Sequence, residues 1–401
     1  MVNYASSLDR VYQYLLIAAF FLLPLTVSGN NIAIWLVVIL WLCSGGYSNK
    51  LKSILDNKLA LASILFFLAH IIGLIWTEDT VWGLEITRKM IPFLFVLPIF
   101  LTLTRKDNNK LYIAAFFIAM LISVSLSYLI WFELIDPFKY ANSSNPTPLM
   151  SHVSYNPFLA FSIYLILNEI LNCNKADKLK IVIYSFLLIL MIINMFITGG
   201  RAGQVMFFAA IVIAMFQYFR LSKLKAVISS FLIVAILSYV AYSTSPLFKE
   251  RVVGVYNEIS NFEENTNTSL GLRINYFINS SELIIKNPIF GVGTGDFPKE
   301  YYKLNLKKSP EFYPTVQPHN MYLLVLSQLG VFGLLCFLSL FFIQFKIALI
   351  SNNKFVNQVG VAMPLLFLII MWSDSYLLGH YTSNLYILFS AYIYGNSVNE
   401  Y

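Results

Sequence analysis

The sequence is short of charged residues. Asp, Glu, Lys and Arg make up only 12% of its 401 residues, whereas hydrophobic residues make up 58%. Ordinary soluble domains contain about 25% charged residues, and their interiors cannot absorb such an apolar surplus. A bilayer can, because an apolar helix of about 20 residues crosses a hydrocarbon core about 30 Å thick. Runs of this length recur along the chain, so we predict an all-α, polytopic membrane protein.

Cysteines are also few, and their number is odd. Cys43 and Cys336 lie in or beside apolar runs, and Cys173 lies in a basic loop. This placement excludes a disulfide framework and the paired spacing of a zinc site. The first apolar run, Val11 to Val27, lacks a small-x-small cleavage site and is followed at once by a second run. We therefore expect a mature helix there and not a signal peptide.

Several functional motifs are missing as well. No Walker A, Rossmann or nucleophile-elbow pattern is present, which argues against work driven by nucleotides. His70 is the only ionisable residue well inside an apolar run, whereas ion-coupled transporters carry buried charges along their path. The net charge of +7 would suggest nucleic acid for a soluble protein. Here the charge follows the loops, so membrane lipids and no nucleic acid are the expected partners.

The apolar runs predict about twelve transmembrane helices. Their expected ranges are 11–28, 30–46, 58–76, 88–104, 111–133, 151–170, 179–197, 202–219, 224–243, 319–345, 355–373 and 380–395. Lys and Arg in the short loops set the orientation. With a cytoplasmic N-terminus, the inner loops hold 15 of these residues and the short outer loops hold only Arg88, Lys89, Lys139 and Arg201. Both termini are therefore predicted to be cytoplasmic.

One long polar segment, residues 244–318, separates the ninth and tenth predicted spans. It holds 16 of the 47 charged residues, and a mere connection would need only a few residues. We expect it to face outward as a lid or wall inserted into a single transmembrane domain, residues 1–401. Within it, Leu272 to Asn287 has the apolar spacing of an amphipathic helix, and Gly291 to Gly295 predicts a flexible turn.

Arg201 follows two glycines in Thr198-Gly-Gly-Arg-Ala-Gly203, where the eighth predicted span begins at its outer end. Free backbone N–H groups, the positive end of the helix dipole and a guanidinium would meet there, an arrangement suited to phosphate. The alternative is an interfacial arginine that reaches the lipid headgroups, with the glycines forming a tight turn.

Two further polar residues lie at the start of the amphipathic helix and at the end of the polar segment. Arg273, in Thr268-Ser-Leu-Gly-Leu-Arg273, begins that helix and could face an anion or simply be solvated. His319, in Gln317-Pro-His-Asn-Met-Tyr322, lies where the polar segment returns to the membrane. It could accept a proton at neutral pH or serve only as a polar cap. No paired His or carboxylate spacing accompanies it, so we expect neither a metal nor another cofactor.

Three motifs together resemble the O-antigen ligase and polymerase family of bacterial envelopes. They are Thr198-Gly-Gly-Arg-Ala-Gly203; Ser269-Leu-Gly-Leu-Arg273 with Asn287-Pro-Ile-Phe-Gly-Val-Gly293; and Pro318-His-Asn-Met-Tyr-Leu323 with Gln328-Leu-Gly-Val-Phe-Gly333. The resemblance rests on the order and spacing of these motifs and on their common side of the membrane. It also rests on the large loop, which precedes a span that begins with histidine.

The resemblance implies a GT-C-like fold and a metal-independent, inverting glycosyltransferase on the periplasmic side of the inner membrane. Its donor would be a glycan on undecaprenyl diphosphate, and the acceptor of a ligase would be the lipid A–core oligosaccharide. By the same resemblance, Arg201 and Arg273 would bind the diphosphate and His319 would act as the base. Arg88, expected just ahead of the fourth span, matches a basic position of the family less closely and would be a further diphosphate ligand.

The leading interpretation is an O-antigen ligase. An O-antigen polymerase would use similar donors with a lipid-linked repeat as acceptor, and a protein O-oligosaccharyltransferase belongs to the same superfamily. A non-enzymatic flippase or transporter of lipid-linked sugars would need a polar path through the spans, for which the sequence offers little.

Overall fold

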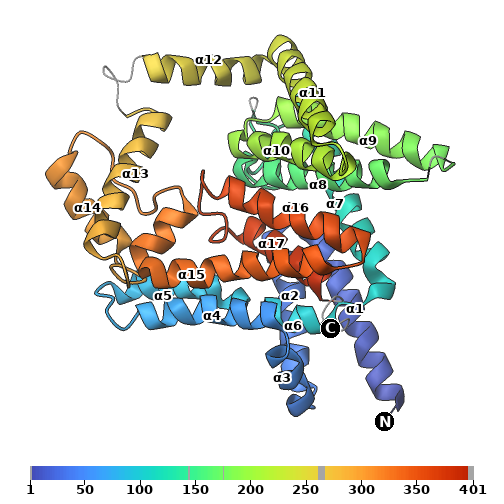
Figure 1. Ribbon diagram of the computed structural model, residues 1–401, viewed down its shortest axis with the longest axis horizontal. Helices are drawn as coiled ribbons and strands as arrows, with labels where there is room; N and C mark the ends of the chain where they lie inside the picture. Colours follow the sequence, from blue (N-terminus) through green and yellow to red (C-terminus); the bar gives the residue numbers. More distant parts are fainter. Residues whose placement is uncertain (1, 143–144, 175, 261–266, 396–401) are drawn as a thin grey trace. The chain divides into compact units, whose positions relative to one another are not determined.

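The computed structural model describes residues 2–142, 145–174, 176–260 and 267–395, and within these ranges it contains helices and no strands (Figure 1). The α-helices are α1 (Val2–Leu22), α2 (Val27–Cys43), α3 (Tyr47–Leu55), α4 (Lys58–Gly73), α5 (Thr80–Leu94), α6 (Val96–Leu103), α7 (Asn109–Trp131), α8 (His152–Asn172), α9 (Lys178–Ile197), α10 (Arg201–Tyr218), α11 (Lys223–Thr244), α12 (Pro246–Ser260), α13 (Ser269–Lys286), α14 (Phe297–Lys308), α15 (Met321–Ile350), α16 (Lys354–Ile370) and α17 (His380–Tyr394). The predicted all-α class is confirmed.

Six stretches of the described chain are long and apolar enough to cross a membrane. They are Thr80–Leu103, Lys106–Trp131, Lys178–Ile197, Arg201–Tyr218, Lys223–Thr244 and Met321–Ile350. A seventh candidate is the pair α3 and α4, which is bent by 87°, and α2 and α16 are shorter apolar helices. Each of the twelve predicted spans overlaps a helix, but the count of twelve stays a prediction.

The fourth predicted span began too late in the sequence. The helix α5 starts at Thr80, where the Asp79 side chain caps it by accepting a hydrogen bond from the Trp82 backbone N–H at 3.0 Å. Such an N-cap satisfies one of the free N–H groups of the first turn. Arg88 therefore lies inside a helix and does not precede one. The stretch from Thr80 continues past a break at Phe95 into α6.

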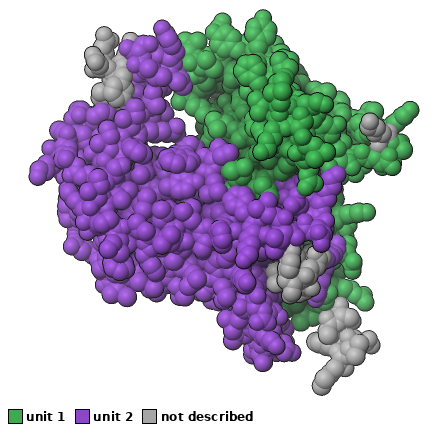
Figure 2. Space-filling model, viewed as in Figure 1, with its two compact units in different colours: residues 1–33, 107–253, 361–366 green, residues 34–106, 254–360, 367–401 purple. Residues whose placement is uncertain are grey.

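The chain divides into two compact units, coloured separately in Figure 2. Unit 1 consists of residues 1–33, 107–253 and 361–366, and unit 2 of residues 34–106, 254–360 and 367–401. In unit 1, α10 packs against α8 and α11, and α1 packs against α7. In unit 2, α15 packs along α4, and α13 and α14 pack against each other and against α15 (Figure 1).

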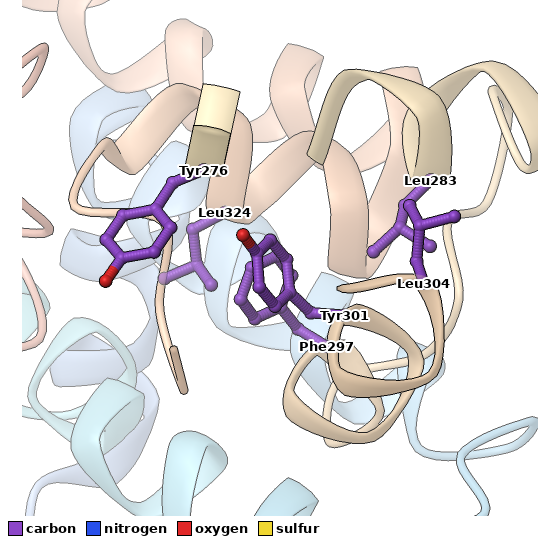
Figure 3. Packing of buried hydrophobic residues seen from close by; sticks show 6 residues of the cluster. All are labelled: Tyr276, Leu283, Phe297, Tyr301, Leu304 and Leu324. Carbon is purple, nitrogen blue, oxygen red and sulfur yellow. The ribbon is translucent and has the colours of Figure 1, made fainter. Parts of the chain in front are cut away.

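The polar segment predicted as a lid forms the helices α12, α13 and α14. The lid cluster, a small apolar core, joins α13 and α14 to the first turn of α15 (Figure 3). Its members are Tyr276, Leu283, Phe297, Tyr301, Leu304 and Leu324, all at most 7% exposed. Burial of this apolar surface fixes the two lid helices onto the helix that follows them in the sequence.

The helix α15 is broken at Gly330, whose φ of 63° and ψ of −160° are not helical. Such a break leaves backbone N–H and C=O groups without helical partners, and these groups need partners inside a membrane protein. The turn 288–293 supplies them through four hydrogen bonds: Val292 N to Ser327 O at 2.8 Å, Gly293 N to Gln328 O at 3.0 Å, Val331 N to Pro288 O at 2.9 Å and Phe332 N to Ile289 O at 3.2 Å. The predicted flexible turn is thus held in place, and its description as flexible is wrong.

Asp296 provides a second attachment for the lid. This buried carboxylate, at the N-terminus of α14, accepts hydrogen bonds from the backbone N–H groups of Glu78 at 2.8 Å and Asp79 at 2.7 Å. Lys299, one turn later, pairs with the exposed Glu78 at 2.7 Å. The buried charge is stabilised because both of its oxygens have donors, and the loop before α5 is fixed to α14.

We expect Gly330→Ala to destabilise the protein. An added Cβ would lie 2.2 Å from the Ile289 carbonyl oxygen, and the backbone there has a positive φ. The conformation alone, which glycine adopts far more readily than any other residue, should lower the free energy of unfolding by about 1–3 kcal/mol, and the clash adds to that. Thermal unfolding in detergent measures the effect. Gly254→Ala, where an added Cβ meets nothing within 4 Å, is the matched control. Equal thermal unfolding midpoints for the two variants would contradict the structural role of the interlock, by which we mean the four hydrogen bonds between the turn 288–293 and α15.

Candidate functional site

His319 lies immediately before α15, with a backbone φ of 49°. Histidine is one of the few residues besides glycine that adopt this left-handed conformation with some frequency. The next residue, Asn320, caps α15 by accepting hydrogen bonds from the Tyr322 and Leu323 N–H groups. The neighbouring backbone is held by the loop after α16, because the Met321 N–H donates to the Met371 carbonyl at 2.9 Å.

The imidazole of His319 is paired with Asp374. Its Nδ1 lies 3.2 Å from Oδ1 of Asp374, and both side chains are partly exposed. The same carboxylate oxygen accepts a hydrogen bond from the Ser375 N–H at 2.8 Å, which fixes its position. With the proton on Nδ1 donated to Asp374, Nε2 keeps its lone pair and can accept a proton. This is the geometry by which a carboxylate orients a histidine base.

Arg273 belongs to α13, whose N-terminus is capped by Thr268 through a 3.1 Å hydrogen bond from the Gly271 N–H. The guanidinium is exposed, and its charge acts on two tyrosines, Tyr276 and Tyr376. Tyr276 also contacts His319, and Tyr376 follows Asp374 by two residues, so Arg273 shares its surroundings with the histidine. No carboxylate forms an ion pair with Arg273 in the part of the chain that the structure describes.

The two tyrosines are neutral groups at neutral pH. Burial raises the pKa of Tyr376, and the negative charge of Asp374 raises it further. Burial also raises the pKa of Tyr276, although the Thr315 hydroxyl and the Arg273 charge oppose this shift. Neither phenol therefore competes with His319 as a base, and neither neutralises Arg273.

Arg201 lies in unit 1, where the structure confirms that it begins a helix after two glycines. The Gly199 N–H donates to Oδ1 of Asn145 at 2.7 Å. At Gly200 an added Cβ would lie 2.5 Å from the His152 carbonyl oxygen. The two glycines thus allow the start of α10 to pack closely on α8, and the helix dipole there favours an anion.

Arg251 also lies in unit 1, and it is not the fully solvated loop charge that its sequence position suggests. Its Nη2 lies 3.3 Å from where a Cβ on Gly199 would be. Its Nε is buried and has no hydrogen-bond partner among the described residues. A second guanidinium is therefore close to the turn that precedes Arg201.

Arg88 is engaged elsewhere. Its Nε and Nη2 donate to the two carboxylate oxygens of Glu85 at 3.0 and 2.9 Å, although the Arg88 side chain remains 66% exposed. Lys89 approaches the same carboxylate at 3.7 Å. An anion would have to displace Glu85 to use the bidentate face of this guanidinium. The contacts of Arg88 thus differ from those of Arg273, which has no such partner.

Unit 2 therefore brings together two of the predicted site residues, Arg273 and His319, and adds Asp374, which the sequence analysis missed. Asp374 lies 55 residues after His319, in a short loop with no local pattern. A signal was nevertheless present, because it is the only carboxylate between Glu311 and Glu400. A lone acidic residue at the end of an apolar span is costly and points to a specific partner.

An apolar groove of about 530 Å³ lies beside the start of α15. Its lining residues are Tyr322, Leu338, Leu368, Ile369 and Trp372. The Tyr322 hydroxyl donates to the Leu368 carbonyl at 2.6 Å, which joins α15 to α16 across the groove. Tyr322 is one turn from His319, so apolar surface and the candidate base are neighbours in this unit.

The described residues contain no group of three or more His, Cys, Asp or Glu side chains placed to hold a metal ion. Cys43, Cys173 and Cys336 are free thiols in this structure.

Two comparisons with known proteins bear on this site. Residues 186–338 match the family model described as O-antigen ligase, and this stretch contains Arg201, Arg251, Arg273 and His319. An uncharacterized protein of Haemophilus influenzae strain KW20/Rd is 23% identical over 293 residues, which is 69% of this chain and 69% of that protein. The family implies lipid-linked glycan substrates, and the apolar helices agree with a membrane protein. Residues 186–338 are therefore similar to the O-antigen ligase family.

Proposed function

We propose that this protein is an O-antigen ligase, which transfers O-polysaccharide from undecaprenyl diphosphate to the lipid A–core oligosaccharide. The observation that carries the proposal is the 3.2 Å contact between His319 and Asp374, next to Arg273 and within a chain that matches the ligase family. A base held in this way suits an acceptor hydroxyl, and an exposed guanidinium nearby suits a diphosphate.

The reaction is a displacement at the anomeric carbon of the donor. Nε2 of His319 takes the proton of the acceptor hydroxyl, whose oxygen forms a bond to that carbon from the face opposite the diphosphate. The bond from the anomeric carbon to the phosphate oxygen breaks, so the configuration inverts and the electron pair leaves with the diphosphate. Arg273 binds the diphosphate and stabilises its growing negative charge, a contribution of several kcal/mol in comparable sites. Arg201 is proposed as a further diphosphate ligand on the resemblance of its motif alone.

The donor needs no further activation, because the diphosphate is already a good leaving group. Guanidiniums replace the divalent cation that a diphosphate often binds, which makes the proposed reaction independent of metal. Arg88 can bind the diphosphate only after its two hydrogen bonds to Glu85 are broken. We place the reaction at the periplasmic face of the bacterial inner membrane, with both termini cytoplasmic, on the distribution of Lys and Arg among the short loops.

Envelope glycolipids of a deletion strain test the choice of reaction. Loss of a ligase should leave O-polysaccharide on its lipid carrier and remove it from lipid A–core, because the final joining step is missing. Electrophoresis of lipopolysaccharide and extraction of the carrier lipid measure the two pools. Core capped with a single repeat would indicate a polymerase instead. Unchanged glycolipids would indicate protein glycosylation or transport.

Transfer by the purified protein should depend on His319 and Asp374. Asparagine accepts the left-handed backbone of residue 319, so His319→Asn removes the base with little backbone cost and should slow transfer by about 10²–10⁴-fold. Asp374→Asn should slow it by about tenfold or more, because the imidazole loses its orienting carboxylate. His380→Asn, at an exposed histidine of unit 2, is the control. Unchanged turnover in His319→Asn would exclude His319 as the base.

Chelation should not affect the reaction. We expect purified protein treated with EDTA to transfer O-polysaccharide at the untreated rate, because guanidiniums carry the charge stabilisation. The rate is measured before and after addition of Mg²⁺ or Mn²⁺. A requirement for either cation would overturn the proposed role of Arg201 and Arg273.

A further inference from the structure

Tyr276 touches the candidate base directly, and neither the sequence motifs nor the proposed reaction assigns it a role. It lies on α13, one helical turn after Arg273, and is only 7% exposed. Its ring stacks on the imidazole of His319, with centroids 5.9 Å apart and planes inclined by 26°. This offset contact lies outside the lid cluster, so packing within the cluster does not account for it.

The other contacts of Tyr276 fix its ring. On one side its ring meets that of Tyr301 edge-on, with centroids 5.9 Å apart and an interplanar angle of 79°. Figure 3 shows Tyr276 at the border of the lid cluster, with its hydroxyl turned away from Leu283 and Leu304. The Thr315 hydroxyl lowers the pKa of the Tyr276 phenol and so opposes the effect of burial, which places the two groups in the same surroundings. Edge-on and stacked aromatic contacts hold a ring more firmly than burial alone does.

Thr315 belongs to the segment just before the histidine. Its Oγ1 donates to the Gln317 carbonyl at 2.6 Å and accepts a hydrogen bond from the Gln317 N–H at 3.2 Å. This closed turn leads directly through Pro318 to His319. Tyr276 therefore contacts the imidazole through its ring and lies close to the turn that precedes the histidine.

The imidazole is thus restrained in two independent directions. Asp374 fixes it in the ring plane through Nδ1, and Tyr276 covers one of its faces. A ring held only by the carboxylate could still tilt about that hydrogen bond. With one face covered, Nε2 is kept in a single direction, as a base that must meet a bound hydroxyl requires.

We propose that Tyr276 is a positioning residue that aligns His319 with Arg273, which rests on the function proposed above. Arg273 and Tyr276 lie one turn apart on the same face of α13. This helix therefore positions both the guanidinium that binds the diphosphate and the ring that orients the base. Tyr276 itself transfers no proton. Its loss leaves donor binding in place and slows the chemical step.

The test uses the full-length protein in nanodiscs, with undecaprenyl-diphosphate-linked O-polysaccharide as donor and lipid A–core as acceptor. Tyr276→Leu should lower kcat by about tenfold to a hundredfold, as misplacement of a catalytic group does, while KM for the donor stays near the wild-type value. Tyr276→Phe keeps the ring and should restore most of kcat. Tyr302→Leu, at a tyrosine of α14 that is 50% exposed, is the matched control.

Several results would overturn the proposal. Wild-type kcat in Tyr276→Leu would exclude a positioning role. So would equal loss in Tyr276→Phe and Tyr276→Leu, because the stacked ring would then not matter. A parallel fall of kcat, donor affinity and thermal midpoint would indicate a purely structural role. If Tyr276→Leu does not fold, Tyr276→Met, whose flexible side chain adapts to irregular gaps and has no flat ring, takes its place.

The same series separates this proposal from the proposed function. If the wild-type protein transfers O-polysaccharide and His319→Asn does not, the proposed function is supported, whatever the rates of the Tyr276 variants. Wild-type rates in the Tyr276 variants would then reject the positioning role alone. Absence of transfer by the wild-type protein under all conditions would overturn both. Binding of undecaprenyl diphosphate alone, measured for wild type and Tyr276→Leu, should give similar affinities.

Discussion

The arrangement of unit 2 depends on backbone hydrogen bonds between the interrupted helix α15 and the turn 288–293. A helix that stops at Gly330 and resumes leaves carbonyl and N–H groups that water cannot satisfy at membrane depth. The turn meets this need with its own N–H and C=O groups. Glycine is required on both sides, since a Cβ on Gly291 would lie 2.4 Å from the Gln328 carbonyl carbon and one on Gly330 would lie 2.2 Å from the Ile289 oxygen. The polar segment and the apolar span are therefore one structure.

These hydrogen bonds fix the polar segment to α15, and the candidate site residues of unit 2 meet at one end of this helix. The helices α13 and α14 reach α15 through the lid cluster, and α13 carries Arg273 and Tyr276 to the start of the helix that His319 precedes. The loop after α16 contributes Asp374 from a distant part of the sequence. Three separate segments thus meet around a single imidazole. The other predicted diphosphate ligand, Arg201, is held in unit 1 by an equally close packing of glycines on α8.

Much of this could be predicted from local sequence. The helical class follows from the apolar runs, and the start of α10 at Arg201 follows from the two glycines before it. Two of the failures depended on contacts between distant residues, and the third on local ion pairs. Asp374 has no local motif, and the single glycine at 330 in an apolar run gives no sign of a break, because isolated glycines are tolerated in helices. The start of α5 was misplaced because Glu85, Arg88 and Lys89 resembled a loop, although they pair with one another on the helix surface.

The carboxylate of Asp296 has a mechanical consequence. Together with the interlock at Gly330, it fastens residues 288–299 at both ends of a short stretch, so this part of the polar segment cannot pivot as a rigid flap. Releasing it would cost several buried hydrogen bonds at about 1 kcal/mol each, and more for those to a charged group. The stretch therefore stays fixed against α15 and the loop before α5.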